Sequence, residues 1–483
     1  MTSGSETPTS RRQKVACVRG TPGKSRNPGS GPVPRTLRQG AAKPKWLKPR
    51  RYRHFDLPVG EAFVLKVMDP RFVAGHRFSP LLHYTKTEKR YKKDPVTAHR
   101  AMTSKERPIK YASHRDACIL AYYAHLLSEA LDARYAADST GENAIAYRAL
   151  GRSNGDFAAE AFRFAQANAP VMILAFDVTS FFDTLDHGLL KARLKSVLGM
   201  SELPDDWYKV FRHITAFHYI ELDELKQHPV FGPRIEERGR DRLASVEELK
   251  AAGVTFHPNP ELAKGFRRGI PQGTPISAAV SNAYMVEFDA AARAFCEEIG
   301  ALYRRYSDDI LVICKPGDAS AAEARIMDLI NSERLEINPA KTEKTLFGAS
   351  AAMMPGTRAA QYLGFTFAED GAAIRERSLS NQWRKLRRAM RRARKNLAYR
   401  IRQGLPAAVH TKGLNRRFTF VTVHDGVSTR ALRNFPSYAR RSAAAFEEGA
   451  RIRSQVRRLA RTARREIAAL KRLGRPDAGS SGP

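Results

Sequence analysis

Cysteine is scarce in this sequence, and its spacing excludes two common ways of stabilising a domain. The 483 residues contain only four cysteines (Cys17, Cys118, Cys296 and Cys314), and no two of them form a CxxC pair. We therefore expect neither a structural zinc site nor a disulfide framework. Reduced thiols are the default for such a chain, which favours a cytoplasmic protein.

Long apolar runs are lacking as well. The longest stretches, such as APVMILAF at 169–176, are much shorter than the roughly 20 apolar residues that a membrane-spanning helix needs. The first 20 residues contain no apolar segment of the kind found in secretory signals. The sequence therefore predicts neither a membrane protein nor a secreted one.

Acidic residues are few at both ends of the chain. Residues 1–54 carry 14 Lys and Arg against one Glu, and residues 381–475 carry 27 against four acidic residues. The net charge of the chain is +34, so these two regions hold the excess and the middle is close to neutral. This pattern predicts a nucleic-acid partner, with a catalytic body between two basic ends. For the N-terminal segment alone, a solubilising tail is an equally good interpretation.

The chain divides into segments of different character. Residues 1–45 are rich in Ser, Pro, Gly and Arg, which predicts disorder. Residues 55–166 read as mainly helical, and PVMILAFDV at 170–178 reads as a buried strand. Residues 266–314 read as loop, helix and then a hairpin, and the part after residue 367 reads as helical and basic. Its last helix has an apolar stripe that we expect to pack on the body, formed by Ile452, Val456, Leu459, Ala463, Ile467 and Leu470.

Adjacent carboxylates occur in YRRYSDDILVIC at 303–314, where Asp308 and Asp309 precede a buried strand. Such a pair can be an ordinary turn dipeptide. It can also be part of a Mg²⁺ site, because this ion prefers a few carboxylates and keeps other positions for water and phosphate. A third carboxylate is then required, and Asp177 at the end of the first buried strand is the candidate. Asp183 and Asp186 follow in a helix, where caps or surface positions are expected.

A turn rich in glycine and proline lies between these acidic motifs. In FRRGIPQGTPISAAVSNAYM at 266–285, a rigid turn leads into a helix of small residues that starts near Ser277. By itself such a turn can be a simple connector. Between two candidate metal-ligand segments, it can instead form a floor for a nucleotide, with Gln272 reaching the incoming one.

Together, these motifs resemble the successive palm motifs of reverse transcriptases over about 105–367. They are FDVTSFFD (176–183), GIPQGTPIS (269–277), YSDD (306–309), INPAKTE (337–343) and YLGF (362–365). The resemblance implies an α+β right-hand polymerase with fingers, an antiparallel palm sheet and a helical thumb. The implied domains are disordered tails at 1–45 and 476–483, fingers at 46–165, a palm at 166–370 with a helical insertion at about 188–265, and a basic helical thumb at 371–475.

The same resemblance implies roles for single residues. Asp177, Asp308 and Asp309 would hold two Mg²⁺ ions, and Lys341 would protonate the leaving pyrophosphate. Phe182 stands at the position that blocks a ribose 2′-hydroxyl, which favours deoxynucleotides. The other implied nucleotide-binding residues are Lys105, Arg107, Arg148, Gln272 and Gly273, and the implied primer-gripping hairpin is Tyr362, Leu363, Gly364 and Phe365. The alternatives are a core position for Phe182, an inert surface lysine at 341, and template contacts for the arginines.

Short strings outside the palm narrow the resemblance. ERPIKYASHRD (106–116) and RNFPSYARR (433–441) resemble the bacterial defence-associated reverse transcriptases, and within them the type-2 branch. This resemblance implies a structured noncoding RNA template and an antiviral role. The resemblance to reverse transcriptases implies dNTPs as substrates and a cDNA product. No membrane partner is expected, and the oligomeric state stays open. A group II intron-type maturase and an RNA-dependent RNA polymerase are the alternatives, and Phe182 argues against the second.

Overall fold

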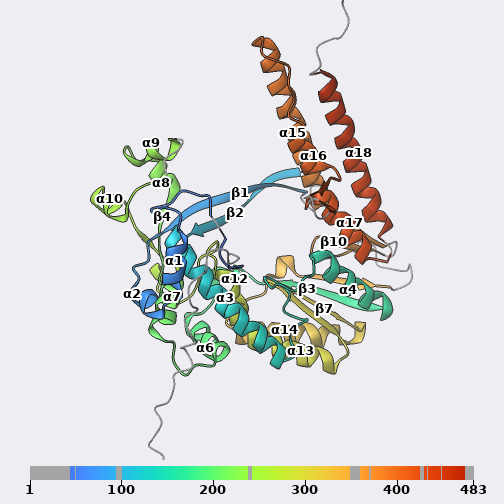
Figure 1. Ribbon diagram of the computed structural model, residues 1–483. Coiled ribbons are helices and arrows are strands. Elements are labelled where there is room, and N and C mark those ends of the chain that lie inside the picture. The colour runs from blue at the N-terminus through green and yellow to red at the C-terminus, as the bar shows by residue number, and fades with distance from the viewer. Residues whose placement is uncertain are drawn as a thin grey trace, which may run out of the picture. The chain divides into compact units, whose positions relative to one another are not determined.

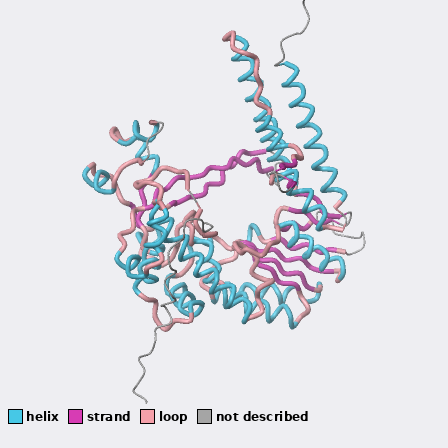
Figure 2. Tube along the Cα trace, in the orientation of Figure 1, coloured by secondary structure: helices cyan, strands magenta, loops and turns pink. Residues whose placement is uncertain are grey.

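The computed structural model describes residues 44–48, 50–93, 100–237, 242–348, 359–368, 371–424, 429–431, 433–447 and 449–473. Apart from Pro44, these residues belong to one compact unit, Lys45–Pro483. Cys17 and the predicted disordered tails at 1–45 and 476–483 lie outside the described residues, except for Pro44 and Lys45. The predicted α+β class is confirmed, with helices and strands both present (Figure 2). Most strand pairs are antiparallel.

The first part of the unit contains a long two-stranded ribbon among helices. The expectation of a mainly helical 55–166 is wrong here, because β1 and β2 pair antiparallel from Leu82↔Tyr111 to Lys93↔Arg100. Many residues of both strands are charged, so no apolar alternation marks them in the sequence. The elements of this part are α1 (Glu61–Val67), α2 (Pro70–Gly75), β1 (Leu81–Lys93), β2 (Arg100–Tyr111), α3 (His114–Ala137) and α4 (Asn154–Ala167).

A second antiparallel sheet carries the candidate carboxylates, and we call it the central sheet. Its strand order is β6-β7-β3-β8, with β3 and β7 in the middle (Figure 1). The strand predicted in PVMILAFDV is confirmed as β3, and it ends at Asp177 as expected. The strands are β3 (Val171–Asp177), β6 (Leu302–Tyr306), β7 (Asp309–Cys314) and β8 (Glu343–Phe347).

The central sheet is buried on both faces. Ile173 and Leu311 belong to a cluster that includes aromatic residues of α4, whereas Leu174 and Ile310 belong to the main cluster with residues of α14. Burial on both faces explains why β3 and β7 are continuous apolar runs without alternation. The predicted order of loop, helix and hairpin over 266–314 is confirmed. The helical elements around the sheet are α12 (Ser277–Tyr284), α13 (Val286–Glu298), η1 (Pro316–Asp318), α14 (Ala319–Ser332) and η2 (Pro339–Lys341).

The expected helical insertion also contains two short strands. β4 pairs parallel with β1, and β5 pairs with β4, so the insertion extends the sheet of the ribbon to the order β2-β1-β4-β5. A small apolar cluster joins Leu82 of β1 to Leu225, Phe231 and Leu249. The elements are α5 (Phe181–Thr184), α6 (His187–Leu198), α7 (Asp205–Thr215), β4 (His218–Glu221), α8 (Leu222–Gln227), α9 (Phe231–Glu236), α10 (Val246–Ala251), β5 (His257–Pro258) and α11 (Pro260–Ala263).

The apolar stripe predicted on the last helix is confirmed, since all six of its residues are buried. Ile452 and Val456 join the cluster beneath the central sheet, while Leu459 and Ile467 pack with Leu386 and other residues of α15. No described helix is long and apolar enough to cross a membrane. The elements here are β9 (Ala360–Tyr362), β10 (Phe365–Ala368), β11 (Gly371–Ile374), α15 (Glu376–Arg402), α16 (Lys412–Phe418), β12 (Thr422–His424), β13 (Thr429–Ala431), α17 (Phe435–Ala445) and α18 (Ala450–Leu473).

Candidate active site

Strand register places two carboxylates opposite each other at one end of the central sheet. In the β3–β7 ladder, Asp177 is the direct partner of Asp309. Directly opposed residues of an antiparallel pair have Cβ atoms about 5 Å apart and project from the same face. Asp308 lies in the adjoining turn, and its carbonyl accepts a hydrogen bond from the Val178 amide at 3.1 Å. The backbone therefore brings the three predicted ligands to one place.

The turn that carries Asp308 is a tight hairpin with an unusual residue. Tyr306 pairs with Asp309, which leaves Ser307 and Asp308 as the two loop residues. Ser307 has a φ of 61°, in the left-handed region that two-residue hairpins require at their first loop position. A residue with a Cβ costs roughly 1–2 kcal/mol there, so the surrounding contacts must hold it. One of them is a hydrogen bond from the Tyr147 hydroxyl to Ser307 Oγ at 3.2 Å.

A buried arginine also fixes the position of this turn, and its role was not predicted from the sequence. Arg305 is fully buried and donates to both carboxylate oxygens of Asp289, at 2.7 and 2.6 Å. Its Nη1 also donates to the Ser307 carbonyl at 3.2 Å and to Asn282 Oδ1 at 3.3 Å. Arg305 thereby ties the turn to α12 and α13. A charged residue within a run of buried strand residues is the signal that could have revealed it.

The predicted proton donor lies directly beside the first carboxylate. Lys341 ends η2, and its Nζ forms an ion pair with Asp177 Oδ2. The local backbone explains this position, because the Asn338 amide donates to the Asp177 carbonyl at 2.8 Å and fixes the η2 turn next to the end of β3. About half of the Lys341 side chain is exposed to solvent.

The electrostatics of the carboxylates fit a cation. Asp309 keeps contact with solvent, but the protein around it partly desolvates its carboxylate. This desolvation and the charges of Asp308 and Asp177 raise the pKa of Asp309 to about 6. Hard carboxylate oxygens are the ligands that Mg²⁺ prefers. In the conformation described, however, no three Asp, Glu, His or Cys side chains among the described residues converge to hold a metal ion. Asp177 instead bonds to Lys341.

The turn rich in glycine and proline joins the ribbon to the α5 segment that follows β3. The Lys110 amide of β2 donates to the Gln272 carbonyl at 2.7 Å. Gly273 has a φ of +110°, and a Cβ there would lie 2.8 Å from the Lys110 carbonyl oxygen, so only glycine fits. The helix predicted near Ser277 is confirmed as α12. Phe182 is half-buried, and its carbonyl accepts from the Ile270 amide at 2.8 Å.

The three basic residues predicted to bind the triphosphate have different surroundings. Lys105 and Arg107 lie on β2, and Arg107 Nη1 forms an ion pair with Glu88 at 2.7 Å. Arg148 donates to two backbone carbonyls of its own loop and forms an ion pair with Asp132 of α3 at 2.9 Å. The nucleotide contacts of all three remain predictions.

The YLGF segment forms the hairpin that the sequence predicted. Tyr362 pairs with Phe365 across the two-residue turn of Leu363 and Gly364, both with positive φ. The Gly364 carbonyl accepts from the amide of Arg375 at 3.0 Å. The positive charge of Arg375 also acts on the Asp309 carboxylate. This links the hairpin to the carboxylates through a residue that no motif indicated. The primer-gripping role remains a prediction.

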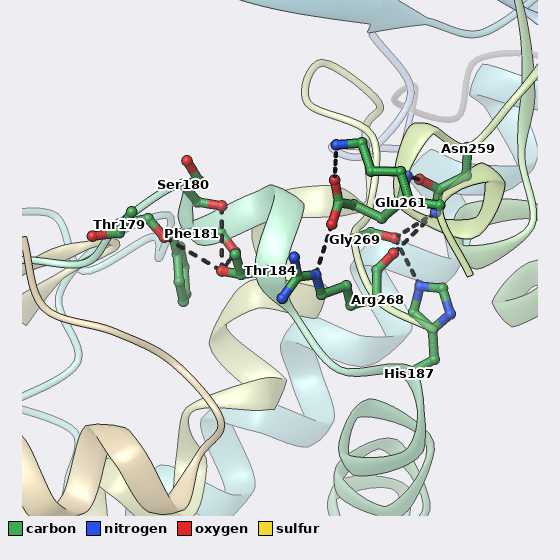
Figure 3. Close-up of polar contacts among 10 residues, drawn as sticks. Thr179, Ser180, Phe181, Thr184, His187, Asn259, Glu261, Arg268 and Gly269 are labelled. Carbon is green, nitrogen blue, oxygen red and sulfur yellow. Dashed lines mark hydrogen bonds and ion pairs between the residues drawn. The ribbon is translucent and has the colours of Figure 1, made fainter. Parts of the chain in front are cut away.

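A cavity of about 530 Å³ lies next to the loop that follows Asp177. Thr179, Ser180 and Thr184 line it on one side, and Glu261, Arg268 and Gly269 line it on another (Figure 3). Arg268 Nε donates to Glu261 at 2.7 Å. The predicted cap at Asp186 is confirmed, because its carboxylate accepts from the Leu189 amide. Asp183, expected at a cap or surface position, instead lines this cavity, where burial raises its pKa.

Comparison with known proteins assigns the family. The family model described as reverse transcriptase (RNA-dependent DNA polymerase) matches residues 92–367, more than half of the chain. The chain belongs to the reverse transcriptase family. The matched reverse transcriptase region holds the three carboxylates, the glycine- and proline-rich turn, Lys341 and the YLGF hairpin. The helices α15–α18 lie beyond it.

Telomerase structures are among the solved structures similar to this reverse transcriptase. Apo telomerase from Candida tropicalis, truncated from its C-terminal domain, has a TM-score of 0.37 and 12% identity, with 61% of this chain and 55% of that chain covered. Telomerase from Candida albicans with the TWJ fragment of telomeric RNA has a TM-score of 0.34 and 13% identity, with 63% and 47% covered. The chain spans about half the length of these telomerases.

Proposed function

We propose that this protein is an RNA-directed DNA polymerase whose catalytic carboxylates are Asp177, Asp308 and Asp309. One observation carries the proposal. The β3–β7 register sets Asp177 against Asp309 beside the Asp308 turn, at the end of two strands whose other residues are apolar. Carboxylates this close together repel each other in their ionised form, unless a cation binds between them. The family assignment supports the same chemistry.

The proposed cofactor is Mg²⁺, two ions per site, held by these three aspartates. When bound, the ions would activate the primer 3′-hydroxyl and stabilise charge on the phosphates. The chain itself holds the carboxylates through the hairpin and Arg305. Asp177 would have to leave Lys341 to take part, and this would free the Lys341 ammonium to donate a proton to pyrophosphate. Gln272, Gly273 and the basic residues of β2 and the 141–148 loop are the proposed nucleotide contacts.

The nucleic-acid partner is proposed from charge. α15 and α18 carry exposed arginines along their length, including Arg387, Arg391, Arg457 and Arg461, while their apolar residues face each other. Such a surface fits the phosphates of a template–primer duplex, and binding to it should weaken steeply as salt is raised. The YLGF hairpin, Tyr362 to Phe365, is proposed to hold the primer end.

Carboxamide substitutions test the polymerase assignment. Asp177→Asn and Asp308→Asn should each abolish Mg²⁺-dependent extension of a DNA primer on an RNA template. Binding of the same template–primer, measured by fluorescence anisotropy, should stay close to wild type. Asp328→Asn, at an exposed position of α14, is the matched control and should keep full activity. Substantial DNA synthesis by either site variant would refute the assignment.

Two assays separate this proposal from its alternatives. Comparing dNTPs with NTPs on one template tests for an RNA polymerase, and preferential use of NTPs would replace our proposal with that function. We also propose that the template is a structured noncoding RNA in the cytoplasm and that the cDNA serves antiviral defence, from the resemblance of 106–116 and 433–441. Sequencing RNA that copurifies with the protein tests this, and recovery of intron RNA would favour the maturase alternative.

A further inference from the structure

A second pocket, of about 470 Å³, lies away from the carboxylates, and we call it the basic pocket. Its walls come from the segment after α2, from α7 and the start of β4, and from α10 and the segment after it. Only Phe217 lines both this pocket and the cavity beside the Asp177 loop. The basic pocket therefore adjoins the candidate active site without sharing any of its predicted residues.

The charge of the basic pocket is of one sign. Four of its lining residues are cations, namely Arg77, Lys209, Arg212 and Lys250, and none is Asp or Glu. Within the described part of the chain, these four side chains form no ion pair or side-chain hydrogen bond; Lys250 has only the field of Glu247 on its own helix. By contrast, Arg268 and Arg334 in the first cavity are paired with carboxylates. Unpaired cations around one concavity attract an anion strongly.

The wall also contains an aromatic pair. Phe78 stacks on the His213 imidazole, with ring centroids 4.1 Å apart and an angle of 12° between the planes. Both residues line the basic pocket.

These features define a ligand with phosphates and a flat ring. Arginine forks and lysine ammonium groups suit phosphate oxygens, and aromatic rings suit a stacked base. A volume of about 470 Å³ is in the range of small-molecule sites. We propose that the basic pocket binds a phosphorylated nucleotide, free or as one unit of an RNA strand, at a site separate from the polymerase centre.

Hydrogen exchange on the full-length protein tests this proposal. Amides of peptides covering 70–80 and 207–218 should exchange more slowly when ATP or a decameric oligo(A) RNA is added. The double variant Lys209→Glu/Arg212→Glu should lose this protection, and its affinity for the probe should fall at least about tenfold, as expected for lost charge-assisted hydrogen bonds. Arg71→Glu, on α2 outside the pocket lining, is the matched control and should keep the protection.

The outcomes distinguish the possible occupants. Protection by both probes supports a site for a free nucleotide, and protection by RNA alone supports a site for a strand. Equal protection by tripolyphosphate would overturn the nucleotide assignment, because no base would then be recognised. Protection by poly-glutamate without protection by ATP or RNA would also overturn it. Because primer extension is measured separately, failure here leaves the polymerase assignment standing, and a double variant that extends primers normally shows that the protein is folded.

Discussion

Variants of the buried ion pair between Arg305 and Asp289 can separate two effects: the positioning of the catalytic turn and the stability of the protein. Both side chains are fully buried, and Arg305 makes the only contact described from this pair to the turn, at the Ser307 carbonyl. Removing one member of a buried ion pair costs about 3–5 kcal/mol, because the other charge stays in the core without its partner. We therefore expect Arg305→Met to lower the free energy of unfolding by about 4 kcal/mol.

The double variant Arg305→Met/Asp289→Leu should recover part of that stability. Replacing both charges by apolar groups removes the buried charge itself. Three groups remain without their partner: the Tyr303 hydroxyl, which donates to Asp289 at 2.6 Å, Asn282 Oδ1 and the Ser307 carbonyl. At about 1 kcal/mol each, they should leave the double variant about 3 kcal/mol below wild type. Its primer extension should nevertheless stay low, because a displacement of about 1 Å at a reacting centre costs on the order of 100-fold.

Urea unfolding and primer extension are the two assays. The Arg305 amide donates to the Asn143 carbonyl, and the Ile145 amide donates to the Arg305 carbonyl. Hydrogen exchange at both amides should become faster in the single variant. Arg293→Met is the control, because its pair with Glu297 lies at the surface and should contribute less than about 1 kcal/mol. A double variant that regained both stability and full activity would refute a positioning role for Arg305. A single variant within 1 kcal/mol of wild type would refute the energetic reasoning.

Three further predictions concern the carboxylates and their neighbours. Because the pKa of Asp309 is raised to about 6, its stabilising contribution is complete below its unfolded value near pH 3.8 and is lost as the pH rises through 6. The melting temperature of Asp309→Asn should therefore match wild type at pH 3 and exceed it at pH 7.5; an equal difference at both pH values would contradict this. Lys341→Met removes the cation beside Asp177, so Mn²⁺ should bind more tightly in calorimetry while single-turnover extension slows; unchanged affinity would contradict competition for Asp177. Phe182→Val should increase NTP incorporation at least about tenfold relative to dNTPs, and unchanged discrimination would remove Phe182 from that role.

The parts of the fold that the sequence predicted are those with a local signal. β3 is a continuous apolar run, α18 has a stripe with helical spacing, and the Tyr362–Phe365 hairpin has a glycine in its turn. The β1–β2 ribbon escaped prediction because its strands are largely charged and are stabilised by pairing, which leaves no apolar alternation. β4 and β5 are too short to show an apolar alternation in the sequence. They form by pairing onto the edge of the β1–β2 ribbon.

In the candidate site, too, residues with a local sequence signal could be predicted and residues that depend on distant contacts could not. Asp177, Asp308 and Asp309 could be proposed because each stands at the end of a recognisable strand or turn. Arg305 and Arg375 could not, because their importance depends on what they contact across the core. The separation of Arg305 and Asp289 by 16 residues gives no hint that they form a buried pair. The ion pair of Lys341 with Asp177 likewise depends on the η2 turn beside β3.

The register of β3 and β7 limits which changes in chain length a gene for this protein can tolerate. Inserting a single codon within 310–313 would either reverse the facing of every later side chain in the strand or, if those residues kept their register, displace Asp309 from Asp177. The connection at 199–204, between two helices, has no such constraint. Natural length variation, and the sites available for inserting tags or reporter domains, should therefore fall in connections of that kind.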